Sequence, residues 1–275
     1  MWCLPRTLPN IVLVSPPIDP TAEFLVRPPT GQDGSMQTRL TEDELAVQDA
    51  FRTFFANESP STVVREAERT GGFSTELWAG LATIGGTGMA LPGAVGGGDA
   101  TLCDLAVVAD VYGAHLAPVP LIEHAVAARL LATIGGHDEL VGELANGTPL
   151  ATIALRPPVD GIARFVPAGA VADVVLAHVG DGIVLDRSAP SGETLPNTGG
   201  LALAHRRLTD DVISVDHAAW NHALDEWRGL TAAAYVGLGR RVIEMGVEYS
   251  RERVQFGVPI GTFQALQQGY ADAST

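Results

Sequence analysis

One stretch of the sequence, residues 222–257, restricts the possible fold most strongly. Apolar side chains recur there every three or four positions, the spacing that places them along one face of an α-helix. The stripe comprises Leu224, Trp227, Leu230, Ala234, Leu238, Val242 and Met245. Its length predicts a single long helix whose apolar face must be covered by other parts of the structure.

The pattern breaks directly after this helix. Arg251 and Arg253 come at its end, Gly257 and Pro259 interrupt the period, and a further helix is expected to start with Thr262 as its N-cap. Cations are favoured at a helix C-terminus by the dipole, which is the ordinary explanation for the two arginines. An exposed guanidinium beside a free helix N-terminus also suits a diphosphate, so this corner is a candidate anion site.

The chain before the long helix divides by pattern into three parts. Residues 1–35 are proline-rich without a helical period, and we expect a disordered leader or a start assigned too early, with Met36 as the natural start. Residues 36–149 read as an N-terminal helical domain. Short β-branched runs separated by Gly, Pro and Asp predict a small middle antiparallel β domain over 150–218.

Residues 219–275 complete the predicted domain order as the start of a C-terminal helical bundle. The expected fold class is therefore α+β, mainly α. A hydrophobic content of 46% is enough for a sizeable core. The formal charge of −15 argues against nucleic acids and anionic membrane surfaces as partners, because both require basic surfaces. No apolar run approaches the length that spans a bilayer.

Residue usage excludes several classes of chemistry. All 17 of the Lys-plus-Arg residues are arginine, so the chain can neither form a lysine Schiff base nor complete a P-loop. Cys3 and Cys103 make no metal or disulfide framework, and the histidines show no metal-ligand spacing. No metal site is expected. A reducing cytoplasm is the simplest compartment for such a chain.

The segment "RVQFGVPIGTFQALQ", residues 253–267, resembles the signature of the acyl-CoA dehydrogenases. Similar resemblance to the helical and β domains of that family extends over about residues 36–275, closest to its shorter bacterial members. It implies a flavoprotein that desaturates an acyl-CoA thioester, in fatty-acid or steroid side-chain metabolism. An α proton passes to a glutamate and a β hydride to FAD.

The resemblance also implies roles for individual residues. Arg253 matches an arginine that reaches across a subunit interface to the FAD diphosphate of the neighbouring subunit, while Phe256 and Gln264 match residues that contact the same cofactor. Asp225 and Arg228 stand where family members approach the CoA moiety. The cofactor expected is FAD, and the partners expected are acyl-CoA and another subunit of the same family.

Two departures from the family pattern concern the active site. The Thr-Glu-Pro segment and Gly-Ser-Asp loop that line the flavin have no counterpart in "ATIALRPPVDGIARF". Some members carry the catalytic glutamate just before the arginine matching Arg228, and that position is Trp227. Glu226, one residue away and rotated by about 100°, is the weak candidate base. The ordinary alternative is a solvated helix carboxylate.

Three hypotheses follow from these departures. A homo- or hetero-oligomer is expected, and the first hypothesis is a heteromer in which this chain lends Arg253 and Gln264 to a partner holding the flavin and the base. The second is a truncated product of a once complete enzyme, since the family's usual C-terminal bundle is mostly missing. The third is a non-catalytic relic of the fold that binds acyl-CoA or a subunit. The acyl chain itself cannot be read from the sequence.

Overall fold

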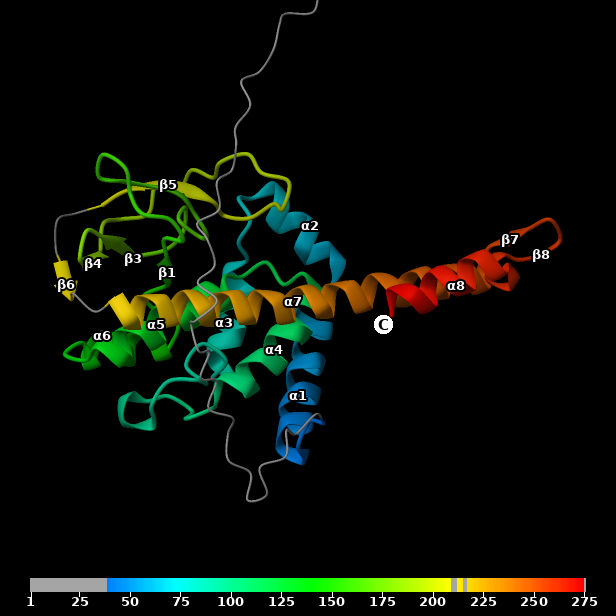
Figure 1. Ribbon diagram of the computed structural model, residues 1–275, viewed down its shortest axis with the longest axis horizontal. Coiled ribbons are helices and arrows are strands. Elements are labelled where there is room, and N and C mark those ends of the chain that lie inside the picture. The colour runs from blue at the N-terminus through cyan, green and yellow to red at the C-terminus, as the bar shows by residue number, and fades with distance from the viewer. Residues whose placement is uncertain (1–38, 209–211, 215–216, 275) are drawn as a thin grey trace, which may run out of the picture. The chain divides into compact units, whose positions relative to one another are not determined.

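The computed structural model describes residues 39–208, 212–214 and 217–274 (Figure 1). The chain divides into two units, Met1–Leu40 and Thr41–Thr275. The expected leader over residues 1–35 lies outside the described residues.

The second unit begins with a helical region. Thr41 and Glu44 form a capping box at its first helix, where each side chain bonds the other residue's backbone N–H. The elements in chain order are α1 (Glu42–Glu58), α2 (Ser61–Arg69), α3 (Thr75–Thr83), the 3₁₀ helix η1 (Gly93–Val95), α4 (Leu102–His115), α5 (Leu121–Ile134) and α6 (Asp138–Ala145).

Short strands follow the helices, as the β-branched runs predict. They are β1 (Ala151–Ile153), β2 (Ile162–Val166), β3 (Val174–Val179), β4 (Gly182–Asp186), β5 (Ala204–Arg207) and β6 (Val212–Ser214). One sheet has the order β1-β3-β4-β6, and β2 pairs with β5 in a second. The pairings in this region are antiparallel, as expected, except that β1 and β3 are parallel. Because β2 lies between them in the chain but pairs with β5 in the other sheet, β3 can run beside β1 in the same direction.

The predicted long helix is confirmed as α7 (His217–Glu252), whose 36 residues make a helix about 54 Å long. A hairpin of β7 (Val254–Gln255) and β8 (Val258–Pro259), the 3₁₀ helix η2 (Ile260–Thr262) and α8 (Gln264–Ala273) complete the chain. Thr262 is not the N-cap of α8. Its hydroxyl donates to the Pro259 carbonyl at 2.7 Å, and Phe263 takes the cap position without a side-chain bond.

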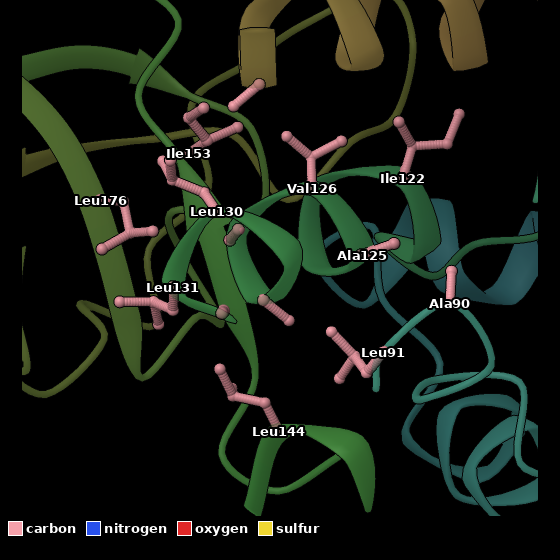
Figure 2. Close-up of a cluster of buried hydrophobic side chains, with 14 of the residues drawn as sticks. Ala90, Leu91, Ile122, Ala125, Val126, Leu130, Leu131, Leu144, Ile153 and Leu176 are labelled. Carbon is pink, nitrogen blue, oxygen red and sulfur yellow. The ribbon is translucent and has the colours of Figure 1, made fainter. Parts of the chain in front are cut away.

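The main core is built around α5. Figure 2 shows Val126, Leu130 and Leu131 of α5 among apolar side chains from the helices and from the β1–β3 pair. Within it, the buried His124 ring accepts the Ala151 backbone N–H on Nδ1 at 3.1 Å, and its Nε2 lies 3.0 Å from the Leu144 carbonyl. Burial lowers the pKa of His124 to about 4, so the ring is neutral and donates through Nε2.

Helices α4 and α7 approach so closely that their backbones touch. A Cβ at Gly113 would lie 1.9 Å from the Ala234 carbonyl oxygen, and one at Gly237 would lie 1.8 Å from that of Asp110. Only glycine fits at these two positions without moving a helix. Arg240 closes the crossing with a 2.8 Å ion pair to Asp110, so α4 fixes the middle of α7.

The two small sheets are joined by a buried ion pair. Arg206 of β5 and Asp186 of β4 lie 3.3 Å apart with side chains 3% and 0% exposed. The same guanidinium donates to the carbonyls of Gly169, Ala172 and Ser188. Both terminal nitrogens of the guanidinium therefore have hydrogen-bond partners, which makes the burial of its charge tolerable.

Among residues 39–208, 212–214 and 217–274, none of the helices combines the length and the apolarity needed to cross a bilayer.

Candidate functional site

The hairpin after α7 forms the corner that the sequence singles out. The Arg253 N–H donates to the Tyr249 carbonyl at 2.9 Å, and the Arg253 carbonyl accepts the Ile260 N–H at 2.8 Å. Phe256 and Gly257 both have positive φ, at 53° and 83°, which reverses the chain between β7 and β8. Arg253 thus stands at the base of the hairpin, and Phe256 stands at its tip.

The side chains of this corner are turned outwards. Phe256 is 93% exposed, and its ring lies 6.2 Å from that of Phe263 in an edge-to-face arrangement. Arg251 and Arg253 are exposed, and neither guanidinium has an ion pair or hydrogen bond within the described part of the chain. Two unpaired cations beside an exposed aromatic pair form a surface that favours an anionic, ring-containing ligand or a protein partner.

Gln264 is the first residue of α8 and is exposed. No side chain caps this helix, and among the described residues no acceptor bonds the backbone N–H groups of Gln264 and Ala265. Free N–H groups at a helix N-terminus attract anions. The structure therefore brings Arg253, Phe256 and Gln264 together around one corner with the electrostatics of an anion site.

Asp225 and Arg228 lie elsewhere, on the first half of α7. Their side chains form a 2.6 Å ion pair with each other and are 64% and 65% exposed. Such an exposed pair three residues apart contributes little to stability. Their approach to CoA stays a prediction.

Glu226 has a different environment from the one expected. Its side chain is 5% exposed, and both oxygens accept hydrogen bonds from Arg129, at 2.9 Å from Nε and 2.7 Å from Nη2. His222 Nε2 lies 3.3 Å from Oε1. The expectation of a solvated carboxylate is wrong. A carboxylate engaged by both ends of a guanidinium has little capacity left to accept a substrate proton, although its role as a base stays a prediction.

Arg129 is the functional neighbour that the sequence reasoning missed. It ties α5 to α7 through Glu226, and it also donates to the Ala90 carbonyl in the loop before α4 at 2.9 Å. Glu226 raises the pKa of Arg129, chiefly through their hydrogen bonds. A charge inside the otherwise apolar run "AVAARLLATI" was the available signal, because a charge on a buried face requires a partner.

Trp227 also has a carboxylate partner from α5. Its indole N–H donates to Glu123 Oε1 at 3.2 Å, and burial is the main cause that raises the pKa of Glu123. The Trp227–Glu123 and Glu226–Arg129 pairs form a polar seam between α5 and α7.

The two groups of predicted site residues are far apart. From Arg228 to the end of α7 at Glu252 the helix rises about 36 Å, at about 1.5 Å per residue. Within one chain, Asp225 and Arg228 therefore cannot share a small-molecule site with Arg253. If both groups act in catalysis, they act on different ligands or in different subunits.

The second half of α7 carries an open apolar surface. Val236, Val242, Met245 and Tyr249 are each more than half exposed, at 58%, 59%, 54% and 58%. A groove of about 710 Å³ lies beside them, with Ile243, Val247 and Arg251 among its lining residues. An exposed apolar patch of this kind is typical of a protein interaction surface.

Comparison with known proteins identifies the family. Residues 41–139 match the model of the acyl-CoA dehydrogenase N-terminal domain, and residues 218–275 match that of the acyl-CoA dehydrogenase C-terminal domain. The chain belongs to the acyl-CoA dehydrogenase family. The family and the mainly helical α+β fold expected from the sequence are confirmed.

Among curated relatives, the acyl-CoA dehydrogenase IpdE2 of Mycolicibacterium smegmatis is 34% identical over 223 residues, 78% of this chain and 66% of the relative. IpdE2 of Mycobacterium tuberculosis is 29% identical over 236 residues, 84% of this chain and 71% of the relative. The chain thus spans about two thirds of the length of these relatives.

Two similar solved structures are named for pairs of proteins. A variant of the Tcur3481-Tcur3483 steroid ACAD matches with a TM-score of 0.76 and 28% identity, over 84% of this chain and 73% of that one. The ChsE4-ChsE5 complex from Mycobacterium tuberculosis matches with a TM-score of 0.73 and 26% identity, over 86% of this chain and 74% of that one.

Proposed function

We propose that this chain is one subunit of a two-component, FAD-dependent acyl-CoA dehydrogenase that introduces an α,β double bond into an acyl-CoA thioester. The observation that carries the proposal is the corner after α7. An unpaired Arg253 stands there beside the uncapped N-terminus of α8 and the exposed Phe256. Similarity to members of two-protein complexes supports the need for a partner.

In this proposal the corner completes a flavin site that opens on the partner subunit. Arg253 neutralises the diphosphate, Gln264 and the free N–H groups of α8 bond the same anionic region, and Phe256 packs against the cofactor. FAD, when bound, accepts the β hydride of the substrate. The residues present fit such a group, because they offer positive charge, N–H donors and an aromatic face without competing partners among the described residues.

The catalytic base is assigned to the partner. Trp227 occupies the position where some family members carry their glutamate, and the neighbouring Glu226 is held by Arg129. The partner would also supply the flavin-lining loop that the segment after β1 lacks. Asp225 and Arg228 remain proposed contacts for CoA, as an exposed pair that a ligand phosphate could open.

The proposal is tested by flavin retention in the assembled enzyme. The chain would be produced alone and together with a second acyl-CoA dehydrogenase subunit from the same organism, and bound flavin would be measured by visible absorbance. We expect the pair, but not the chain alone, to retain flavin. Arg253→Ala should weaken flavin binding by about 10–100-fold, the usual cost of one hydrogen bond to a charged group.

Two controls accompany that variant. Arg253→Lys keeps the charge but loses the two-pronged geometry, so its loss should be smaller. Arg52→Ala removes an exposed arginine of α1 that pairs only with its own helix and should leave flavin unchanged. Equal flavin occupancy in Arg253→Ala and the unaltered complex would contradict the proposal.

A second candidate function is a non-catalytic subunit that binds acyl-CoA or a partner without contacting flavin. The engagement of Glu226 by Arg129 favours it, since no free carboxylate is provided from that position. Acyl-CoA binding measured by calorimetry on the chain alone, combined with a partner whose flavin content and turnover are independent of this chain, would select this alternative.

A further inference from the structure

Two histidines join the β region to the start of α7. His178 is on β3 and His217 is the first residue of α7, and His178 Nε2 lies 2.8 Å from His217 Nδ1. The bond spans 39 positions of the sequence. It adds a side-chain contact from β3 to the start of α7, which follows β6 of the same sheet in the chain.

The surroundings of the pair fix its geometry on both sides. Asp181, in the turn between β3 and β4, lies 3.5 Å from His217 Nε2. On the other side the His178 ring lies over Trp220, with centroids 5.6 Å apart and planes inclined by 32°. Trp220 is 5% exposed and belongs to the main core, so it provides a rigid support.

The number of lone pairs on the two rings decides when the bond can exist. A neutral imidazole has one N–H donor and one acceptor nitrogen, whereas an imidazolium has two donors and no acceptor. With neither or one ring protonated, one acceptor nitrogen remains for the short contact. With both rings protonated, two cations face each other at this distance without an acceptor, and the bond is lost.

We propose that His178 and His217 form an acid-released latch that holds the start of α7 against the β3–β4 turn. Above neutral pH the latch is closed. In mild acid the second protonation separates the two rings and frees the first turns of α7 from the sheet. The proposal is independent of the flavin chemistry above.

The charges around the latch set the direction of its pH dependence. Burial lowers the pKa of His178 first, the neighbouring His217 lowers it further, and Asp181 opposes both. The open state therefore binds more protons than the closed state. The stabilisation is fully present above the ordinary histidine pKa and is lost as the pH falls below it.

The latch can be tested by hydrogen exchange along the chain. Amides from Asn221 to Glu226 would be followed at about pH 7.5 and about pH 5.5, with rates corrected for the intrinsic effect of pH. We expect their protection in the unaltered protein to fall by about tenfold in acid. Protection of α5 serves as the internal reference for a general effect of acid on the core, because α5 carries the neutral, buried His124.

Two variants separate the latch from a general effect. His178→Gln offers an amide that can donate or accept at any pH, so the acid-induced loss of protection at the start of α7 should disappear. His205→Gln changes another strand histidine, on β5, and should leave that loss in place. Unchanged protection at the start of α7 in the unaltered protein, or an equal fall in α5, would overturn the proposal.

A measurement without any variant gives an independent check. Imidazole nitrogen shifts of His178 and His217 would be recorded against pH by NMR. We expect two coupled steps, with the second proton taken up at distinctly lower pH than the first. Two identical, independent titrations would overturn the latch even if the variants failed to fold.

Discussion

The two halves of α7 have the same pattern of apolar residues but different surroundings. Residues 217–237 lie against α4 and α5 and bury Trp220, Leu230 and Ala234, whereas beyond Gly237 the described structure buries only Ser250 (Figure 1). The α8 helix lies beside the second half and contacts it through Tyr270, whose hydroxyl is 2.8 Å from that of Ser250.

This difference shows that one periodic stripe can serve two purposes. In the first half it completes the core of the chain itself, and the α4 crossing ends that contact. In the second half it remains on the surface, next to the corner that carries Arg253. The second half therefore has the character of an interface, and the proposed partner would be the element that covers it.

The largest effect is expected in the first half, at Arg129. Arg129→Ala leaves Glu226 buried without its cation, so we expect the free energy of unfolding to fall by about 3–5 kcal/mol, measured by urea denaturation. Replacing both residues, as Arg129→Met with Glu226→Leu, should cost clearly less. A loss below about 1 kcal/mol in Arg129→Ala would mean that Glu226 reaches water, and the contrast between the halves would weaken.

The next effect compares two residues of the predicted stripe directly. Leu230 is 1% exposed and Met245 is 54% exposed. Leu230→Ala should destabilise the isolated chain by about 2–5 kcal/mol, whereas Met245→Ala should change its stability by no more than about 0.5 kcal/mol. Thermal unfolding of both variants measures this. If Met245→Ala weakens subunit association more than Leu230→Ala does, that result would support an interface at the second half of α7. Equal losses of unfolding free energy in the two variants would contradict the difference between the halves.

The smallest effect concerns two glycines separated by two positions in α7. Gly237→Ala places a methyl group against the Asp110 carbonyl, so we expect a loss of about 1–3 kcal/mol. Gly239→Ala meets nothing within 4 Å, so higher helix propensity should stabilise it by up to about 1 kcal/mol. Denaturant unfolding curves of the two variants measure whether each substitution lowers or raises the free energy of unfolding. Two stabilised variants would show that the α4 crossing is looser than described.

Much of the fold could be predicted because its signals are local. The capping box at Thr41 and the uninterrupted period of α7 depend on residues a few positions apart, and the long helix predicted from that period is confirmed. The parallel pairing of β1 with β3 depends on where β2 goes in between, which no local pattern encodes. Thr262 had the right residue type for an N-cap, but it lies in the 3₁₀ turn η2, and the N-cap is one position later, at Phe263.

The candidate site was predictable only in part. The corner at Arg253 and Gln264 lies within a dozen residues, so the sequence alone brings these side chains together. The environment of Glu226 depends on Arg129, which is 97 positions away, and on how α5 lies against α7. For the same reason, the sequence could not tell which part of the α7 stripe is covered.

The Arg206–Asp186 pair has a consequence for how the β region can change over generations. Substituting either residue alone would strand the other's charge in a dry interior, so each single step between the present pair and an apolar pair passes through a poorly folded intermediate. Substitutions at these two positions are therefore expected to occur together. This requirement links β4 and β5 even where the surface loops around them vary.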